Sequence, residues 1–150
     1  MVLRDPVHRA FSNWRFSVAN GLEDLEFEEC LTDTAEQRPF AGSSTSPFHY
    51  RRRSCYADLI APWAESFGQR LIVLQYERMV AHDGPNYLEE RLQVLGLSHP
   101  PLGGHAHERV NAAGHLATLD RDVAVRLAAE LESSSKRLVE FGVDLSLWTR

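Results

Sequence analysis

The 150-residue chain has little cysteine, a single lysine and no long apolar run. Two cysteines, Cys30 and Cys55, are too few to indicate an oxidising compartment or a disulfide framework. The longest purely apolar run, Leu71–Leu74, is far shorter than the roughly 20 residues that a membrane-spanning helix needs. The residues after Met1 also lack the apolar stretch of a signal peptide. These absences predict a cytoplasmic protein without a membrane partner.

Positive charge is scarce and almost all of it is arginine. The net charge is −5, and binding to nucleic acid needs a basic surface, so we expect no nucleic-acid partner. Lys136 is the one lysine among sixteen basic residues. The nine glycines form no Gly-x-x-x-x-Gly-Lys phosphate loop, which excludes that route to nucleotide binding within these residues.

The chain does have the composition of one folded domain. It is 43% hydrophobic and 25% charged, which is close to the average for globular proteins. A chain of this length can bury roughly 68–70% of the surface that its unfolded form exposes. We find no internal repeat and no linker, and therefore treat residues 1–150 as a single domain.

Helical spacing of apolar residues predicts most of the structure. Asp5 is a good N-cap, and Pro6 suits the first helical position. Four long helices are expected over residues 6–20, 56–67, 86–95 and 119–141, with a shorter one over 25–31. In the second long helix the spacing places five apolar residues toward the core: Tyr56, Leu59, Ile60, Trp63 and Phe67.

Two strands are recognisable, at residues 1–3 and 70–76. The apolar run at 71–74 is typical of a parallel strand that is buried on both faces. Strands separated by helices favour an α/β fold with parallel pairing. Two strands are fewer than open α/β sheets usually contain, so the sheet is expected to be incomplete. Long loops are expected over 32–49 and 98–117.

The segment from Leu3 to Trp14 has the sequence Leu-Arg-Asp-Pro-Val-His-Arg-Ala-Phe-Ser-Asn-Trp. It resembles the nucleotide 3′-phosphate motif of sulfotransferases that use 3′-phosphoadenosine 5′-phosphosulfate. The resemblance implies that Arg4 and Ser12 hold the 3′-phosphate. Their chemistry fits this role, because a guanidinium offers a fork of donors to phosphate, a hydroxyl adds one more, and a helix N-terminus favours anions.

Further segments resemble the same family in the same order. They are the Phe-Glu-Glu-x-Leu segment at 27–31, the Tyr-x-x-x-x-x-x-Trp helix at 56–63, the strand ending in Tyr-Glu at 71–77, the Leu-Gly-Leu turn at 95–97 and the C-terminal segment at 142–148. The second of these departs from the family's Gly-x-Tyr-x-x-x-Leu-x-x-Trp pattern, because no glycine lies near Cys55 and Tyr56. Each match alone is weak, and their order strengthens the resemblance.

The resemblance implies an incomplete P-loop-NTPase-like sulfotransferase fold, with flanking helices and a helix-rich C-terminal part. It implies sulfuryl transfer from 3′-phosphoadenosine 5′-phosphosulfate to a hydroxyl or amine acceptor, with carbohydrate as one candidate, and without a metal. In the family the 5′-phosphosulfate loop and the catalytic base precede the Arg-Asp-Pro motif. Neither is present in these residues, so we expect the C-terminal portion of a sulfotransferase that is inactive alone.

An alternative reading belongs to a different functional class. The chain would then be an inactive remnant or a half-protein that binds a nucleotide or another chain. Self-association is expected in either case, because the strand at residues 1–3 would leave an unpaired edge.

Other candidate residues have competing interpretations. Arg109 is the one basic residue between Arg91 and Arg121, and the resemblance favours a role in covering the nucleotide. Arg51–Arg53 could meet an anionic acceptor, but a solvated run of charge is the simpler interpretation. His105, with two further histidines at positions 107 and 115, suggests a polar loop rather than a metal site, because metal sites need three or four converging ligands.

Three further groups are interpreted as structural. Glu77 ends a predicted strand, where catalytic residues are common, but the resemblance favours a structural role. Tyr56 and the tryptophans are assigned to the core, with the acceptor cleft as an alternative for Tyr56. Cys30 and Cys55 are interpreted as ordinary thiols.

Overall fold

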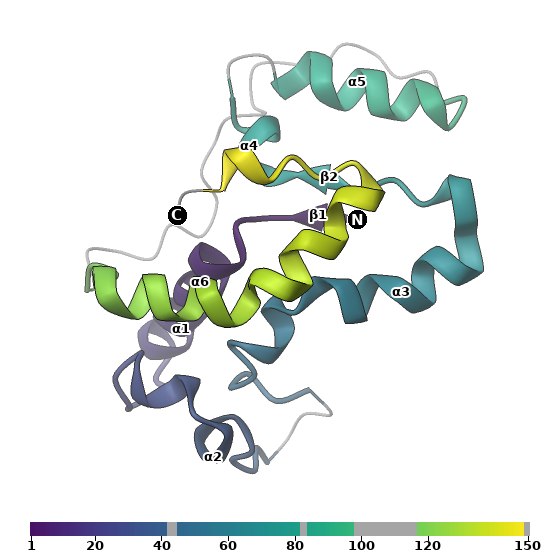
Figure 1. Cartoon of the computed structure of the whole chain (residues 1–150). Helices are drawn as coiled ribbons and strands as arrows, with labels where there is room; N and C mark the ends of the chain where they lie inside the picture. The colour runs from purple at the N-terminus through teal and green to yellow at the C-terminus, as the bar shows by residue number, and fades with distance from the viewer. Residues whose placement is uncertain (42–44, 82–83, 98–116, 149–150) are drawn as a thin grey trace.

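The structure is a computed structural model that describes residues 1–41, 45–81, 84–97 and 117–148. Short 3-10 turns connect its main elements (Figure 1). In chain order these elements are β1 (Val2–Leu3), α1 (Pro6–Ala19), α2 (Asp33–Glu36), α3 (Tyr56–Phe67), β2 (Leu74–Gln75), α4 (Tyr76–Met79), α5 (Gly84–Val94) and α6 (Arg121–Lys136). The described part is therefore rich in helix.

The two strands pair in parallel, as the sequence predicted. Val2 pairs with Leu74 and Leu3 with Gln75. This small sheet among helices agrees with the α/β class at a coarse level. The expectation of a strand over 70–76 that is buried on both faces was wrong, because β2 has two residues and Leu71–Leu74 is half-buried. Only one face of the two-stranded sheet is covered by the rest of the protein. Leu3 and Gln75 are buried on that face, whereas Val2 on the opposite face is 52% exposed.

Helix α1 begins as predicted. The Asp5 carboxylate accepts hydrogen bonds from the backbone N–H groups of Val7 (2.9 Å) and His8 (3.0 Å), and Pro6 fills the first position. One face of α1 is buried, and it includes Ala10, Phe11 and Trp14 among its residues. Gly21, with φ of 65°, follows the end of the helix and adopts the left-handed conformation that glycine tolerates.

Helix α6 packs against α1 (Figure 1). Asp120 caps it, accepting from the backbone N–H groups of Asp122 and Val123. The spacing of four apolar residues predicts a buried stripe on this helix, and each of the four is buried: Val123, Leu127, Leu131 and Leu138. The helix is shorter than predicted, since it tightens into a 3-10 turn after Lys136 and ends before Gly142, whose φ is 75°.

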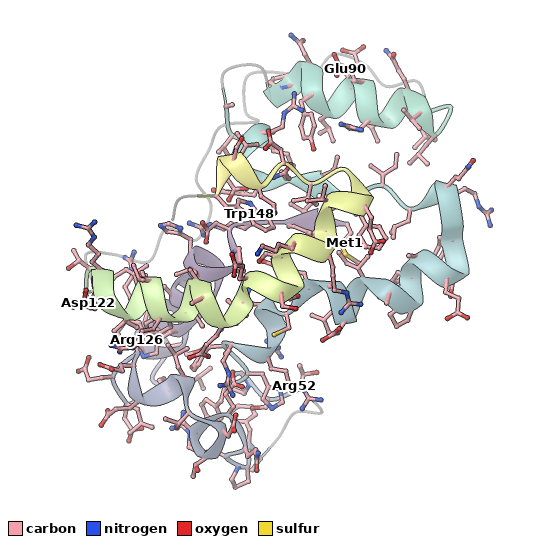
Figure 2. The ribbon with its side chains drawn as sticks, in the orientation of Figure 1. Met1, Arg52, Glu90, Asp122, Arg126 and Trp148 are labelled. Atoms are coloured by element: carbon pink, nitrogen blue, oxygen red, sulfur yellow. The ribbon has the colours of Figure 1, made fainter. Side chains whose placement is uncertain are left out.

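The buried apolar residues form two clusters. The first lies between α1 and α6 and contains the aromatic trio Phe11, Trp14 and Phe27. The second joins β1, α3 and the C-terminal segment, and it includes Leu3, Ile60, Leu138 and Trp148. Figure 2 shows Trp148 beside β1.

Several expected details were wrong. The helix expected over 25–31 is a single 3-10 turn, Glu29–Leu31. The Thr32 hydroxyl accepts from the Ala35 N–H and so starts α2 inside the expected loop. The buried residues of α5 are Gly84 and Tyr87. The spacing of Leu88, Leu92 and Leu95 predicts an inward-facing side for this segment, but Leu95 is 41% exposed.

Helix α3 has the predicted bounds but a different buried face. Tyr56, Ala57 and Ile60 are buried. Three other residues expected in the core are roughly half exposed: Leu59 (47%), Trp63 (52%) and Phe67 (46%). They follow one another at intervals of four residues and form one apolar stripe. We call this set the α3 stripe. The assignment of Trp63 to the core was therefore wrong, whereas Trp14 and Trp148 are buried.

Among the helices of the described ranges, none combines the length and the apolarity that crossing a bilayer requires.

Candidate functional site

The sequence motif lies where the two parallel strands end. Arg4 directly follows β1, and Tyr76 directly follows β2. Parallel strands end on the same side of a sheet, and in open α/β sheets ligands bind outside these carboxyl ends. We call this side of the sheet the carboxyl edge.

Arg4 is half-buried at the carboxyl edge. Its guanidinium carbon lies 5.1 Å from the centre of the Tyr76 ring, a cation–π contact. Among the described residues, no carboxylate lies within 4.0 Å of this guanidinium. The ring thus orients the side chain of Arg4 and leaves its charge available to an external anion.

Glu77 links three parts of the chain at this edge. Its Oε1 atom accepts a hydrogen bond from the Asp5 backbone N–H at 2.8 Å. Its Oε2 atom accepts one from the indole N–H of Trp148 at 3.3 Å. Both carboxylate oxygens are therefore engaged in bonds that hold β1, α4 and the C-terminal segment together. These contacts agree with the structural interpretation of Glu77.

The N-terminus of α1 is less open to an anion than the sequence suggested. The Asp5 carboxylate already occupies the N–H groups of Val7 and His8 and brings a negative charge of its own. Its Oδ1 atom also lies 3.3 Å from Nδ1 of His8. The hydrogen bond to Asp5 raises the pKa of His8, although partial burial opposes the shift. Any phosphate here must therefore be bound by side chains more than by the end of the helix.

Ser12 lies two turns into α1 and is exposed. It follows His8 by four residues, so the two side chains share one face of the helix. Arg4 precedes His8 by four residues, at the start of the same segment. Within the described ranges, no hydrogen bond joins Arg4 to Ser12. Ser12 is thus exposed on α1 and Arg4 is half-buried just before the helix, and the structure does not connect them directly.

Other proposed ligands lie outside the described residues. This holds for Arg109 and for the three histidines His105, His107 and His115. In the ranges that are described, no cluster of three or more His, Cys, Asp or Glu side chains could hold a metal ion. Lys136, the one lysine, lies at the end of α6 and pairs with Glu132 at 3.0 Å. It lines a small hollow of about 60 Å³ beside Pro6 and Trp148.

The basic run at 51–53 is not a solvated run of charge, so that interpretation was wrong for Arg51. Its guanidinium pairs with Asp33, Glu36 (3.7 Å) and Glu130 (3.5 Å). Arg53 donates to the Ser46 carbonyl at 2.8 Å, and Arg52 is exposed. Figure 2 places Arg52 on the same side of the molecule as α2. Arg51 and Arg52 line a cleft of about 430 Å³ together with three carboxylates, those of Asp33, Glu36 and Glu130.

Of the remaining candidates, Tyr56 and Cys30 are buried and Cys55 is partly buried. Burial raises the pKa of Tyr56 to about 12, against the opposing effects of Arg9 and the Arg4 backbone N–H. Burial also raises the pKa of Cys30 to about 12 and that of Cys55 to a smaller extent. The two cysteines are thus free, protonated thiols, as the sequence suggested.

Sequence reasoning missed Arg9, whose guanidinium joins α1 to a distant loop. It donates to the Ser54 hydroxyl at 2.9 Å, to the Asn13 side chain at 3.3 Å and to the Tyr50 carbonyl. Arg9 lies between Arg4 and Ser12 in the motif and positions the helix that carries Ser12. The sequence offered no signal for the partners in the loop, because Tyr50 and Ser54 lie more than 40 residues away.

Comparisons with protein-family models, with curated proteins and with solved structures found no match to this chain.

Proposed function

We propose that this chain forms the 3′-phosphate-binding part of a sulfotransferase that uses 3′-phosphoadenosine 5′-phosphosulfate. The observation that supports it most is the position of Arg4, at the carboxyl edge, with a charge that no carboxylate among the described residues neutralises. In this proposal β1 and β2 are two strands of a larger P-loop-NTPase-like sheet. The protein would act in the cytoplasm.

The anchoring chemistry comes from two side chains. The Arg4 guanidinium donates a fork of N–H groups to the 3′-phosphate, and Tyr76 restricts its orientation. The exposed Ser12 hydroxyl donates one further hydrogen bond to the same group. Charge-assisted hydrogen bonds of this kind contribute about 1.5–3 kcal/mol each.

The reaction itself takes place on groups that these two residues do not touch. The acceptor oxygen or nitrogen attacks sulfur, and its proton passes to a base. The bond from sulfur to the 5′-phosphate oxygen breaks, and the nucleotide leaves as the 3′,5′-bisphosphate. Arg4 and Ser12 bind and orient the nucleotide, while the base and the donors to the leaving oxygen come from outside these 150 residues.

The test compares adenosine 3′,5′-bisphosphate with adenosine 5′-monophosphate by isothermal calorimetry. In Arg4→Ala the dissociation constant of the bisphosphate should rise by about 10- to 150-fold. That of the monophosphate should hardly change. Ser12→Ala should show the same selectivity with a smaller loss, because the lost bond has an uncharged donor. Arg121→Ala is the matched control, since Arg121 is exposed at the start of α6.

Equal losses for both nucleotides in Arg4→Ala would mean that Arg4 does not recognise the 3′-phosphate. A loss in Arg121→Ala as large as in Arg4→Ala would point to non-specific attraction between charges.

A second candidate is a binding module that docks on another chain. The α3 stripe favours it, because three large apolar side chains on one helix stay roughly half exposed. Such a module would keep nucleotide binding at Arg4 and depend on its partner for any chemistry.

A further inference from the structure

His8 lies in the first turn of α1, the helix that begins just after β1 (Figure 1). It follows Arg4 by four residues and precedes Ser12 by four. His8 and Ser12 are both helical, so their spacing places them on one face of α1. The guanidinium of Arg4 and the imidazole of His8 are close enough for the positive charge of Arg4 to lower the pKa of His8. His8 therefore adjoins both proposed ligands of the 3′-phosphate.

The two ring nitrogens of His8 have different surroundings. Nδ1 lies 3.3 Å from Oδ1 of Asp5, so the carboxylate orients the ring and keeps a proton on Nδ1. Within the described part of the chain, Nε2 has no hydrogen-bond partner, and 43% of the side chain is exposed. In the neutral ring Nε2 is an acceptor, and it gains an N–H group when the ring is protonated. Only protonated His8 can therefore donate a hydrogen bond from Nε2 to a phosphate.

The charged groups that act most on this ring are Arg4 and Asp5, just before α1, and Glu77 of α4. The hydrogen bond to Asp5 has the largest effect and raises the pKa of His8 above 6.5. The negative charges of Asp5 and Glu77 raise it further, whereas burial and the charge of Arg4 oppose the shift. The ring thus stays protonated to a higher pH than an isolated histidine does.

Protonation of His8 removes an obstacle to anion binding at α1. The Asp5 carboxylate caps the helix and brings a negative charge to its N-terminus. A protonated His8 balances that charge through Nδ1 and still offers the N–H group at Nε2 to a ligand. Because a phosphate monoester carries a charge of about −1.5 to −2 near neutral pH, its bond with this N–H group is charge-assisted on both sides.

We propose that His8 is a third ligand of the nucleotide 3′-phosphate and that it binds this group only when its ring is protonated. Nδ1 stays with Asp5, and the N–H group at Nε2 donates to a phosphate oxygen, beside the donors from Arg4 and Ser12. The identity of the anion as a 3′-phosphate rests on the proposed function. Affinity for the 3′-phosphate should therefore fall as His8 loses its proton at rising pH.

The test measures the dissociation constants of adenosine 3′,5′-bisphosphate and adenosine 5′-monophosphate by isothermal calorimetry between about pH 6.5 and 8.5, where phosphate monoesters are mostly dianionic. In the wild type the dissociation constant of the bisphosphate should rise about tenfold with pH, the loss of one charge-assisted bond. His8→Gln should bind the bisphosphate at low pH as weakly as the wild type does at high pH. His8→Lys should bind it equally at every pH, since lysine keeps its charge.

The matched control is His49→Gln, because His49 is also half-buried but lines the cleft around Arg51. This variant should keep both the affinity and its pH dependence. A second readout is the pKa of the His8 ring, followed by NMR of its carbon-bound protons. The bisphosphate should raise this pKa and the monophosphate should not. The NMR measurement needs no substitution at His8, so it decides the matter even if His8→Gln unfolds.

Unchanged affinity and pH dependence in His8→Gln, beside a selective loss in Arg4→Ala, would overturn the role of His8 and leave the proposed function standing. The same pH dependence for both nucleotides, or an equal effect of His49→Gln, would also overturn the role of His8. No binding of the bisphosphate by the wild type at any pH, or equal losses for both nucleotides in Arg4→Ala, would overturn the proposed function and the role of His8 with it.

Discussion

The carboxylate of Glu23 accepts five hydrogen bonds that join three segments of the chain. Two come from the Arg38 guanidinium, at 3.0 and 2.5 Å, and one from the Tyr50 hydroxyl at 3.0 Å. The backbone N–H groups of Asp24 and Leu25 supply the other two. The Glu23 side chain is fully buried, so these donors replace the water that an ionised carboxylate needs.

This arrangement predicts that the free energy of unfolding changes with pH in the acidic range. Burial alone would raise the pKa of Glu23, but the bonds from Arg38, Leu25 and Tyr50 lower it from 4.5 to about 2. A lowered pKa stabilises the fold above the pKa of the unfolded carboxyl, and this contribution is lost as the pH falls from about 4.5 to about 2. Glu23→Gln should therefore lower the free energy of unfolding near neutral pH and flatten its dependence on acidic pH.

The loss at neutral pH should be about 3–5 kcal/mol, as for other buried pairs that lose one partner. Urea unfolding at a series of pH values measures both effects. Glu26→Gln is the matched control, because Glu26 is exposed nearby. A Glu23→Gln curve that runs parallel to the wild type across the acidic range would contradict this account of the Glu23 pKa.

Single residues were predictable where their partners are local. Asp5 was recognised as a cap because the backbone N–H groups that donate to its carboxylate lie two and three residues away. Glu23 and Arg51 were not recognised, because their side-chain partners lie 15 to 79 residues away in sequence. The nucleotide role of Arg4 and Ser12 came from the family resemblance, and it stays a prediction.

At the scale of elements, the long helices were predictable because apolar spacing and caps are local signals. The bounds of α1 and α3 and the buried stripe of α6 follow this rule. The buried face of α3 was not predictable in the same way. That helix is apolar over a wide arc, and its neighbours β1 and α6 decide which side is buried.

The α3 stripe predicts association of the isolated chain. Trp63 and Phe67 stack with ring centres 5.8 Å apart and remain about half exposed. Contiguous exposed apolar patches are typical of interaction surfaces or of aggregation. The double variant Trp63→Gln/Phe67→Gln should therefore shift the mass toward the 17.0 kDa monomer, with little change in melting temperature.

Size-exclusion chromatography with light scattering measures this shift, and Glu65→Gln on the same helix is the control. A wild-type chain that stays monomeric at high concentration would show that the stripe is not an association surface.

At the scale of the whole molecule, one apolar cluster lies between α1 and α6, and a second packs against β1 of the two-stranded sheet. The sequence predicted the parallel order but overestimated the length of β2, because strand pairing depends on distant residues that local patterns do not reveal. The α/β class was recognisable at a coarse level from strands separated by helices. The sulfotransferase type of fold remains part of the proposal.

The isolated 150 residues should not catalyse sulfuryl transfer. They contain no Gly-rich loop with lysine, and both oxygens of the strand-end carboxylate Glu77 are engaged in structural bonds. Removing one preorganised donor commonly lowers a rate by about 10²–10³, and loss of the base adds to this. An assay with labelled phosphosulfate donor and several hydroxyl and amine acceptors measures it. Transfer well above the uncatalysed rate would mean that catalytic residues lie within this chain.

The most direct test of the central claim is a two-dimensional ¹H–¹⁵N NMR titration of the chain with adenosine 3′,5′-bisphosphate. The account predicts that the largest shifts fall on the amides of Arg4 and Ser12 and of the residues between them. Adenosine 5′-monophosphate at the same concentration should leave these amides unchanged, and Arg4→Ala should abolish the response to the bisphosphate. The same shifts from both nucleotides, or the largest shifts at the cleft around Arg51, would contradict a 3′-phosphate site at Arg4 and Ser12.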